Sequence, residues 1–517
     1  MVKKSKKKTE SEVITTTGKL NAIIKSARDI MRKDKGLNGD LDRLPQLTWI
    51  MFLKFLDDME QIHETEAELS SKQYSSIIRP PYRWRDWAKK ADGVTGPELI
   101  SFVNNDETTL PNGSKGVGLL AYLKTIQGDN GFDRRDVIAS VFRGVSNRML
   151  NGYLLRDVIN KISEINFSSS DEIHTLSHLY GSILKQLRDA AGDSGEFYTP
   201  RPVVKFIVKV IDPKIRETIL DPACGTGGFL IESYVHLTKQ CKTTEQREFL
   251  QTKSLQGIEA KSLPYLLCQM NLLLNGIELP NIDPLNALRF PLREIGEKDR
   301  VDIVMTNPPF GGAEEKGILS NFPEDKQTSE TFLLFLQLIM RKLRRSKSGK
   351  KSGRCAIVMP NGILFGDKTT AIIRKELLTE FNLHTIVRLP DGVFAPYTPI
   401  PTNILFFEHG GPTEEIWFYE VPVSNGRKQF TKTKPIEFED FQSVIDWWRD
   451  RKENDFAWKI KVKDIENTGY DLDLHHPRRM AEDKLLSPNK MLELINNEVH
   501  QLESELNELT SIFTKTT

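Results

Sequence analysis

The segment NPPF at 307–310 combines residue types that could hold the amino group of a planar base. It follows the apolar run VDIVMT, so it lies where a buried strand is expected to end. Its two prolines fix φ and keep Asn307 extended, which makes the Asn307 amide and the Pro308 carbonyl two rigid acceptors. Phe310, directly beyond them, could stack on the base. The alternative is a proline turn that only closes the strand.

A glycine-rich turn, DPACGTGGFL at 221–230, stands two expected strands earlier. It leads into the helical pattern LIESYVHLTKQ, and such a turn lets backbone approach a ligand, while the helix N-terminus favours a carboxylate or phosphate. The spacing differs from the dinucleotide pattern G-x-G-x-x-G and from the triphosphate pattern G-x-x-x-x-G-K-[ST]. Hydride transfer and ATP hydrolysis are therefore disfavoured. The turn also favours the base-binding interpretation of NPPF.

An acid, Glu259, ends the run SLQGIEA on the strand expected after the glycine-rich turn. A carboxylate in this place can accept hydrogen bonds from both ribose hydroxyls of an adenosine group. The alternative is an exposed acid at the end of a strand. Its position directly behind a glycine-rich turn favours the ribose-binding role.

Short apolar runs alternate with helical stretches from about residue 216 onward, which predicts a mostly parallel sheet with helices on both faces. Ligands bind outside the carboxyl ends of such strands, so the residues directly after each run are candidates for chemistry. We expect this sheet to run to about residue 420. The six runs are ETIL before 221, SLQGI before 259, VDIVMT before 307, CAIVM before 360, HTIVRL before 390 and NILFFEH before 410.

A helical periodicity from about 17 to 166 predicts an all-α N-terminal domain. Its clearest stretch, RLPQLTWIMFLKFLDDMEQIHE, has a broad apolar face followed by acids. The residues of that face are Leu47, Ile50, Met51, Leu53, Phe55 and Leu56.

Two segments are strongly basic: residues 3–8 supply five lysines, and residues 341–354 hold eight cations and no acid. Each can be a solvated tail or loop, or can contact nucleic-acid phosphates without reading sequence.

Apolar residues at 495–513 recur at spacings of 4, 3, 4, 3 and 4, the pattern of a coiled-coil seam. This helix must bury its seam on its own domain or on another chain, and we favour another chain because no domain follows it.

Composition indicates a folded, soluble protein of about three domains, with 517 residues, 38% hydrophobic and 28% charged. The 72 Lys and Arg nearly balance the 71 Asp and Glu, so bulk charge does not indicate a nucleic-acid partner. The four cysteines show no C-x-x-C spacing, and His174 and His178 lack an accompanying acid, so we expect reduced thiols and no metal site. The apolar run at 331–340 is about half a membrane span and the basic N-terminus lacks an apolar signal, which predicts a cytoplasmic protein without a membrane partner.

Together, GEFYTP at 195–200, DPACGTGGF at 221–229 and NPPF at 307–310 resemble the modification subunit of type I restriction-modification systems, an S-adenosylmethionine-dependent adenine-N6 DNA methyltransferase. The resemblance covers most of the chain, including the helical N-terminal region and LPDGVFAPYTPIPTNILFFEHG. It implies a Rossmann-like class I methyltransferase sheet with an all-α N-terminal domain and a C-terminal coiled-coil-like helix. The implied domains are 1–166, a catalytic domain at 167–472 and an assembly tail at 473–517.

The resemblance assigns cofactor roles by position. The residues implied at the methionine end of S-adenosylmethionine are Thr199, Pro200, Asp221, Cys224, Gly225 and Gly227. Glu259 falls on the ribose-binding acid, and Asn286 on the residue that reads the cofactor adenine, although its flanks depart from G-[DN]-[ST]-L. HTLSHLYGSIL at 174–184 also departs from the family's D-x-x-G-x-x-Y-E pattern.

On the substrate side, the resemblance gives Asn307 and Pro308 as acceptors of the target amino group and Phe310 as the stacking aromatic. Phe394, in the GVF segment, matches a second aromatic on the other face of a flipped adenine, and a core phenylalanine is the alternative. Such a reaction needs neither a metal nor a general base, because orienting the amino nitrogen toward the sulfonium methyl is the protein's main contribution.

An expected sheet that ends near 420 leaves under 100 residues, too few for an independent target-recognition domain. The resemblance supplies the implied partners: double-stranded DNA, a separate specificity subunit, an ATP-dependent restriction subunit that acts as translocase and nuclease, and two copies of this chain per complex. Alternatives are a protein-glutamine or RNA methyltransferase, which shares N-P-P-[YF] but is usually shorter, and an inactive assembly scaffold.

Overall fold

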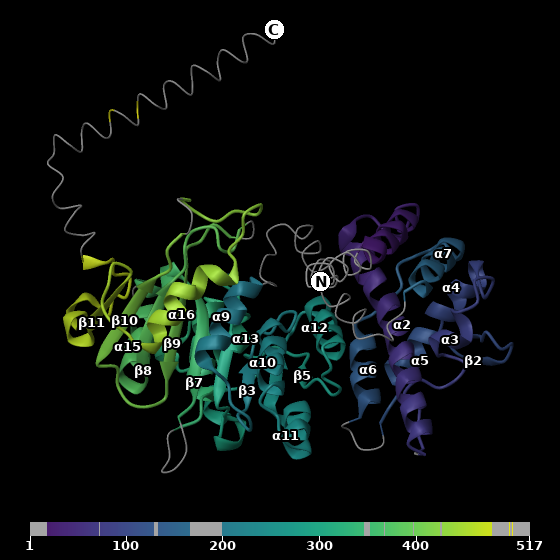
Figure 1. Ribbon diagram of the computed structural model, residues 1–517, viewed down its shortest axis with the longest axis horizontal. Helices are drawn as coiled ribbons and strands as arrows, with labels where there is room; N and C mark the ends of the chain where they lie inside the picture. Colours follow the sequence, from purple (N-terminus) through teal and green to yellow (C-terminus); the bar gives the residue numbers. More distant parts are fainter. Residues whose placement is uncertain are drawn as a thin grey trace, which may run out of the picture.

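Two bodies lie side by side along the long axis of the computed structural model (Figure 1). An N-terminal domain comprises residues 18–165, and a sheet domain comprises residues 199–477. The structure describes residues 18–71, 73–128, 133–165, 199–345, 352–366, 368–395, 398–423, 427–477, 496 and 499. Several predicted features lie outside these residues: the basic tail at 3–8, the two histidines at 174 and 178, the first four residues of GEFYTP, the middle of the basic segment (346–351), and all of the seam at 495–513 except 496 and 499.

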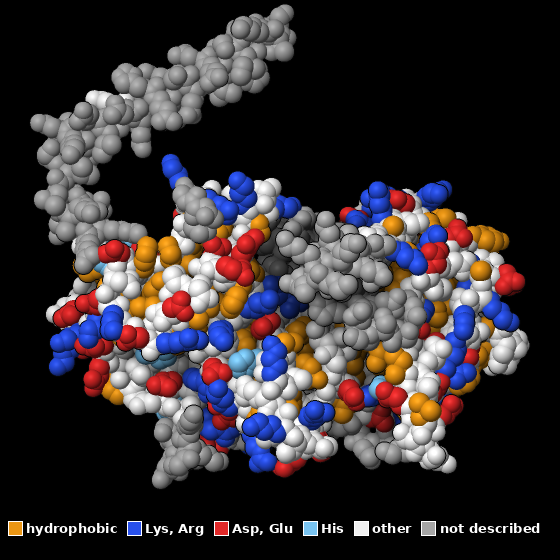
Figure 2. Space-filling view, viewed as in Figure 1, with side chains coloured by type: hydrophobic (Ala, Val, Ile, Leu, Met, Phe, Trp, Pro, Cys, Tyr) orange, Lys and Arg blue, Asp and Glu red, His pale blue; other side chains and the backbone are white. Residues whose placement is uncertain are grey.

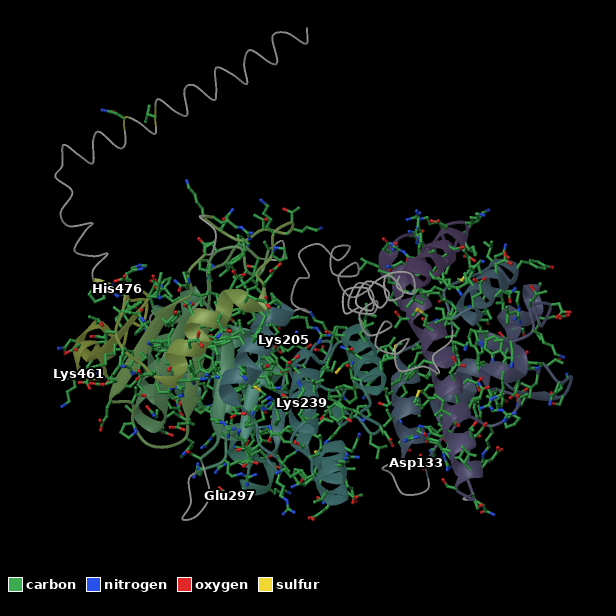
Figure 3. All side chains as sticks on the ribbon, in the orientation of Figure 1. Asp133, Lys205, Lys239, Glu297, Lys461 and His476 are labelled. Atoms are coloured by element: carbon green, nitrogen blue, oxygen red, sulfur yellow. The ribbon has the colours of Figure 1, made fainter. Side chains whose placement is uncertain are left out.

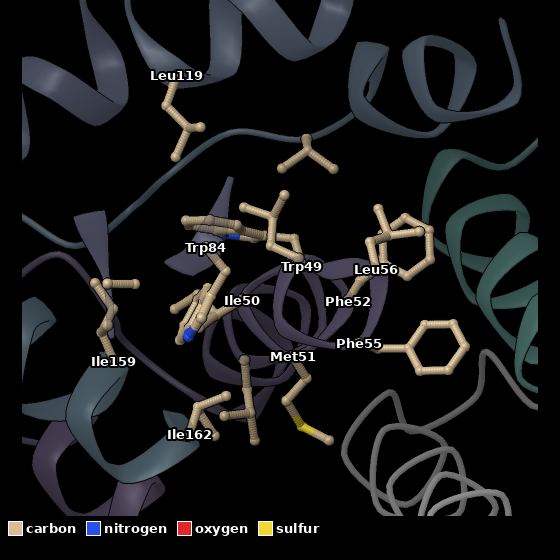
Figure 4. Packing of buried hydrophobic residues seen from close by; sticks show 14 of the residues in the cluster. Trp49, Ile50, Met51, Phe52, Phe55, Leu56, Trp84, Leu119, Ile159 and Ile162 are labelled. Atoms are coloured by element: carbon tan, nitrogen blue, oxygen red, sulfur yellow. The ribbon is translucent and has the colours of Figure 1, made fainter. Parts of the chain in front are cut away.

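A long helix, α2 (Asp40–Leu69), forms the centre of the N-terminal domain. Figure 4 shows its buried side chains, among them Trp49 and Phe52, packed against Trp84 and Ile159 from neighbouring elements. The other helices are one over 18–31, α3 (Trp84–Trp87), α4 (Gly96–Asn104), α5 (Leu119–Thr125), α6 (Arg134–Arg143) and α7 (Gly152–Ser163).

The expectation of an all-α N-terminal domain is wrong in one detail, because a short antiparallel hairpin pairs β1 (Glu107–Thr109) with β2 (Lys115–Val117). The turn contains Asn112 and Gly113, and Gly113 has φ 85°. An Asn-Gly pair supplies the positive φ that tight hairpin turns require, so the sequence did contain a signal for this hairpin.

The sheet domain is built on nine strands in the order β11-β10-β8-β9-β7-β6-β3-β4-β5. Five neighbouring pairs are parallel, and the three pairs β7 with β9, β8 with β9 and β10 with β11 are antiparallel. The strands are β3 (Ile219–Asp221), β4 (Leu255–Ile258), β5 (Ile282–Asp283), β6 (Ile303–Thr306), β7 (Arg354–Pro360), β8 (Asn382–Arg388), β9 (Thr402–Glu408), β10 (Glu415–Glu420) and β11 (Ala457–Lys461).

The predicted mostly parallel sheet is confirmed, and all six predicted runs form strands. The expected end near residue 420 is wrong, because β11 adds an edge strand at 457–461. Between β10 and β11 the chain forms α16 (Gln442–Arg449). Because this helix separates β11 from the other strands in the sequence, the apolar runs did not indicate that the sheet continues.

Helices cover both faces of the sheet, and side chains of one strand alternate between the two cores. On β6, Ile303 and Met305 pack with α9 (Arg201–Ile211), α10 (Gly228–Thr238), α12 (Ser262–Leu274) and α16, whereas Val304 packs with α14 (Thr331–Lys342) and α15 (Thr369–Glu380). The remaining helices of the described chain are α11 (Thr244–Phe249), α13 (Lys316–Leu319) and short 3₁₀ or π turns.

The apolar run at 331–340 forms most of α14, whose first ten residues are all buried in the sheet domain. The apolar residues of this run therefore form part of the core of the sheet domain. Within the described residues, no helix is both long enough and apolar enough to span a membrane. Figure 2 shows basic and acidic side chains interspersed over the displayed face, as the near-equal numbers of the two kinds suggest.

Helix α12 belongs to both cores. Leu266, Leu267, Met270 and Leu274 are buried with the N-terminal domain, and Tyr265, Cys268 and Leu272 are buried with the sheet domain. The Tyr265 hydroxyl also makes a 2.6 Å hydrogen bond with the hydroxyl of Ser140 on α6. The two domains therefore share one helix.

The end of the sheet domain extends past the expected boundary between 472 and 473. Asp473 pairs with Arg388 at 2.7 Å, and the ring of His476 contacts Trp458 at a centroid distance of 5.0 Å. Figure 3 shows His476 at the same end of the domain as Lys461 of β11. Asp473 and His476, which were expected in the C-terminal tail, thus pack on the sheet domain.

Candidate active site

The carboxyl ends of β6, β3 and β4 meet at one edge of the sheet. In the parallel register, Leu220 lies beside Val304 and Asp221 beside Gly257. The segments that follow these strands hold the NPPF motif, the glycine-rich turn and Glu259. The topology therefore brings together three groups that are far apart in the sequence.

Asn307 presents a buried acceptor at this edge. Its side-chain N–H donates to the hydroxyl oxygen of Thr199, with Nδ2 and Oγ1 3.1 Å apart. Its Oδ1 atom is buried and has no hydrogen-bond partner among the described residues. Leaving such an acceptor unpaired costs about 1–3 kcal/mol. The oxygen is thus available to a donor from outside the chain.

Phe310 and Phe394 are in contact, with ring centroids 6.1 Å apart and ring planes at 63°. Phe310 is half-buried, and Phe394 is buried in the core beneath it. Two rings that sandwich a base would be parallel and about 7 Å apart, twice a ~3.5 Å contact distance. The structure therefore places both predicted aromatics together, but a base could enter between them only after one ring rotates.

The GVF segment that carries Phe394 is held by a close approach of backbone. Gly392 has φ 77°, and a Cβ added there would lie 1.9 Å from the carbonyl oxygen of Phe430. Only glycine fits this position.

The glycine-rich turn runs from β3 into α10 through two left-handed residues, Gly225 (φ 52°) and Gly227 (φ 81°). A Cβ on Gly227 would lie 2.9 Å from Cys268 Sγ. The backbone N–H of Gly225 donates to Glu259 Oε2 at 3.0 Å, and the N–H of Lys261 donates to Glu259 Oε1 at 2.8 Å. Glu259 is therefore fixed against the turn while staying partly exposed.

Asp221 lies under this turn and is 1% exposed. Its Oδ1 accepts the backbone N–H of Ala223 at 3.2 Å. Burial raises the pKa of Asp221 to about 7, the Thr306 hydroxyl and the Ala223 N–H oppose this increase, and the charge of Glu259 adds to it. Asp221 supports the turn from beneath, without an exposed carboxylate at the edge.

Cys224 is also a packing residue, with its sulfur 3.8 Å from that of Cys268. Both thiols are buried, and burial together with the neighbouring Cys268 raises the pKa of Cys224 well above its ordinary value. A thiol of this kind is a poor nucleophile at neutral pH.

Asn286 is not directed to the turn, because both ends of its side chain are engaged locally. Its Oδ1 accepts the N–H of Leu288 at 2.9 Å, and its Nδ2 donates to Glu314 Oε2 at 3.3 Å. The nearby Asp283 ends β5 and pairs with Arg289. Neither of these two hydrogen-bond partners, Leu288 and Glu314, is one of the predicted site residues.

A residue that was not predicted also supports the turn. Asn271 of α12 is 1% exposed and donates from Nδ2 to the backbone oxygen of Thr226 at 2.9 Å. An asparagine within the otherwise apolar stretch SLPYLLCQMNLLL is the signal that could have identified it, since buried amides are retained where they find partners.

Comparison with known proteins identifies the family of this chain. The N-6 DNA Methylase family model matches residues 171–484, and the HsdM N-terminal domain model matches residues 20–162. This chain belongs to the N-6 DNA methylase family. The methylase is 47% identical to the type I restriction enzyme EcoEI methylase subunit of Escherichia coli, over 89% of this chain and 90% of the relative. It is 30% identical to the StySPI methylase subunit of Salmonella potsdam, over 71% and 68%.

Solved structures give the same result. A modification subunit from Vibrio vulnificus YJ016 is 62% identical, with a TM-score of 0.83 over 89% of the methylase and 97% of that chain. A chain from a study of assembly and conformational transition in the type I restriction-modification system is 37% identical, with a TM-score of 0.73 over 96% and 98%. The methylase is thus a type I methylase subunit with the class I S-adenosylmethionine-dependent methyltransferase fold.

S-adenosylmethionine is the methyl donor of this enzyme class, and the residues at the sheet edge fit it. The turn passes this edge through the left-handed Gly225 and Gly227, and Glu259 provides a fixed carboxylate one strand away. A carboxylate is the acceptor that ribose hydroxyls require.

Proposed function

We propose that this methylase transfers a methyl group to N6 of an adenine flipped out of double-stranded DNA, within a type I restriction-modification complex. The observation that supports it most directly is the buried Oδ1 of Asn307, which has no hydrogen-bond partner among the described residues. Asn307 lies three positions before Phe310, which is in contact with Phe394. An adenine amino group supplies the donor that this oxygen lacks, and its ring supplies the planar face that the two aromatics can cover.

The side-chain oxygen of Asn307 and the carbonyl oxygen of Pro308 each accept a hydrogen bond from the adenine amino group. The amino nitrogen of adenine is a poor nucleophile because its lone pair is delocalised into the ring. Two acceptors favour a pyramidal nitrogen with its lone pair directed at the reacting carbon. Bound S-adenosylmethionine supplies an electrophilic methyl group on a sulfonium sulfur. Rotation of Phe310 or Phe394 opens the space for the base.

On the cofactor side, we assign the ribose hydroxyls to Glu259 and the methionine end to the backbone of Gly225 and Gly227. Asp221, Cys224 and Pro200 shape this end from beneath, because all three are buried. Asn286 reads the cofactor adenine in this proposal only if its contact with Glu314 opens.

The methylase acts in the cytoplasm with other subunits in this proposal. The described chain contains a helical domain and a sheet domain. In this proposal, a separate specificity subunit recognises the target sequence. A restriction subunit that uses ATP completes the complex, with two copies of this chain. The similarity to a chain from an assembled type I system supports this arrangement.

Replacing Asn307 with alanine tests the proposal. N307A should abolish methyl transfer from labelled S-adenosylmethionine to DNA and should leave the cofactor Kd nearly unchanged, because the lost acceptor serves the target base. Asn160→Ala is a matched control, since Asn160 in the N-terminal domain also has a buried Oδ1 for which the described part of the chain offers no hydrogen-bond partner. Methylation by N307A at the wild-type rate, or transfer to RNA or protein in place of DNA, would contradict the proposal.

A further inference from the structure

Three arginines and a histidine lie close together at the amino edge of the sheet, where β6 and β7 begin and the antiparallel β9 ends. This basic cluster consists of Arg300 before β6, Arg341 and Arg345 at and beyond the end of α14, and His409 after β9. Figure 3 shows Glu297, the ion-pair partner of Arg300, at the lower end of the sheet domain. Arg300 and Asn307 flank β6, and a strand rises about 3.3 Å per residue, so the cluster lies roughly 20 Å from the candidate active site.

Backbone hydrogen bonds hold the segments of the basic cluster together. The N–H of Val301 donates to the oxygen of Lys342, and the N–H of Arg344 donates to the oxygen of Val301, both at 2.9 Å. The N–H of Gly353 donates to Arg344 at 2.8 Å, and the N–H of His409 donates to Gly353 at 2.9 Å. A Cβ on Gly353 would lie 2.5 Å from the backbone nitrogen of Arg344. The sheet therefore fixes the backbone of the cluster.

Acids at this edge pair with part of the positive charge. The ion pairs are Arg300 with Glu297 at 2.5 Å, Arg344 with Asp302 at 2.5 Å and Arg354 with Glu217 at 2.7 Å. Two other acids are Asp299, which attracts Lys342, and Glu380, which attracts His409. Arg341 and Arg345 are exposed and form no ion pair within the described part of the chain. Since residues 341–354 hold eight cations and no acid, this edge carries an excess of positive charge.

Arg300 is the buried member of the basic cluster, with 8% of its surface exposed. Its Nε atom is buried and finds no hydrogen-bond partner among the described residues. Burial lowers the pKa of Arg300, the charges of Arg345 and Arg341 lower it further, and Glu297 opposes them. The folded chain therefore holds like charges close to a desolvated guanidinium, which is unfavourable until an anion neutralises them.

His409 adds a neutral donor to the basic cluster. Its ring packs edge-on against Phe381 at a centroid distance of 5.0 Å. Burial lowers the pKa of His409, and the charges of Arg345 and Arg300 lower it further, so the ring is neutral at pH 7 and keeps one N–H. Guanidinium and imidazole N–H groups together suit an anion with several oxygen atoms, such as a phosphate group.

We propose that the basic cluster binds the phosphodiester backbone of duplex DNA outside the methylated site. Guanidinium groups match phosphate oxygens in geometry, and such contacts read no sequence. The cluster is on the edge opposite Asn307, so the phosphates that it contacts belong to DNA away from the flipped adenine. This inference rests on the proposed function only in taking DNA as the substrate. Sequence-independent binding of this kind keeps a protein on DNA between target sites.

Removing the two exposed charges tests the proposal. In the full chain, Arg341→Gln combined with Arg345→Gln should raise the Kd for a short fluorescent duplex roughly tenfold near 50 mM salt. The slope of log Kd against log salt should fall by about 2, since each phosphate contact contributes about 0.9. Lys89→Gln combined with Lys90→Gln is the matched control, because both lysines are exposed on the N-terminal domain and the net charge changes equally. This control should change the slope by less than about 0.5.

Removing the acid that pairs with Arg300 should act in the opposite direction. Glu297→Gln makes Arg300 available to phosphate and should lower the duplex Kd roughly two- to fivefold. Glu68→Gln removes an exposed acid of α2 in the N-terminal domain and should leave the Kd nearly unchanged. A substitution that only damaged the fold would not tighten binding.

Three results would overturn the proposal. Equal slope changes in R341Q/R345Q and K89Q/K90Q would mean that binding depends on net charge alone. A wild-type duplex Kd and slope in R341Q/R345Q would mean that the cluster does not contact DNA. If that variant also lost association with the restriction subunit, the cluster would be a site for an acidic protein surface.

Failure of the proposed function would look different. In the assembled complex, R341Q/R345Q should methylate a short duplex carrying the target site at the wild-type rate, because the basic cluster and the candidate active site lie on opposite edges of the sheet. Absence of methylation by the wild-type complex would count against the proposed function, and the duplex Kd values would still decide whether the cluster binds DNA.

Discussion

Asp221 is a buried acid at the candidate site, and its protonation makes the folding stability depend on pH. Burial raises its pKa to about 7 from an ordinary 3.8, so the folded chain binds this proton more tightly than the unfolded chain does. Between these two values the folded state holds more protons, and stability falls as pH rises. The contribution of Asp221 is therefore most favourable below about pH 4 and is lost as pH approaches 7.

The substitution Asp221→Asn should therefore stabilise the methylase more at pH 8 than at pH 5, by about 2 to 3 kcal/mol. The asparagine keeps an oxygen for the Ala223 N–H and removes the charge. Denaturant unfolding at the two pH values measures the difference.

Asp302→Asn is the matched control for this measurement. Burial alone would raise the pKa of Asp302, but hydrogen bonds from Thr218 and Arg344 outweigh burial and lower it. Asp302 is then ionised at both pH values in both states. D302N should destabilise the protein equally at pH 5 and pH 8. A D221N effect that does not change with pH would show that Asp221 is ionised in the folded protein.

At this scale, sequence reasoning predicted that NPPF, the glycine-rich turn and Glu259 meet at one edge of the sheet, because the strand ends of a parallel sheet determine where such residues lie. It did not identify how Asn286 is engaged. That depends on Glu314, 28 positions away in a loop whose course no periodicity indicates. Asn271 was missed for the same reason, since its partner Thr226 lies 45 positions away.

At the scale of elements, α12 contacts both domains and the glycine-rich turn. One face, with Met270, is buried in the N-terminal domain, and the opposite face, with Cys268 and Leu272, lies under Gly227. The same helix donates Asn271 to the turn. Docking of the N-terminal domain and the shape of the glycine-rich turn therefore depend on the same helix.

Alanine substitutions on the two faces should separate these roles. Leu272→Ala should raise the Kd for S-adenosylmethionine, because it leaves a cavity under Gly227. Met270→Ala, equally buried at 2% exposed, should leave that Kd nearly unchanged and increase hydrogen exchange in α6 and α12. Each variant should lose about 2–5 kcal/mol of unfolding free energy. If M270A weakens cofactor binding as much as L272A does, the two faces are energetically coupled through the helix.

Elements were predictable where apolar runs are long. All six runs became strands, but β5 has two residues and carries no pattern of its own. The antiparallel direction of β9 was also not predictable, because strand direction depends on how the connections cross the sheet and not on the composition of the strand.

At the scale of the whole molecule, residues 471–477 close the sheet domain. The N–H of Leu472 donates to the oxygen of Leu364 at 2.9 Å, and Asp473 accepts from both Arg388 and Asn361. The sequence analysis placed the domain boundary between 472 and 473. The partners are Asn361 and Leu364 of a 3₁₀ turn and Arg388 at the end of β8, all far away in the chain, so the sequence pattern could not indicate these contacts.

Two truncations test the division between catalytic domain and assembly tail. A chain ending at 477 keeps every contact described above and should retain its stability and its Kd for S-adenosylmethionine. It lacks the predicted seam at 495–513, so it should associate weakly or not at all with the specificity subunit. A chain ending at 470 also loses the buried Leu472 and the Asp473–Arg388 pair, and should lose several kcal/mol of stability, on the order of a core truncation.

The physical reason for the first outcome is that a helix of about 23 residues is marginal in water unless something covers its apolar stripe. Size-exclusion chromatography with the specificity subunit, together with cofactor binding, measures both properties on the same samples. Full association of the chain ending at 477 would assign docking to another surface, with the N-terminal domain as the next candidate. Loss of cofactor binding in that chain would mean that the tail packs on the catalytic domain, and the seam would then be part of the protein's own core.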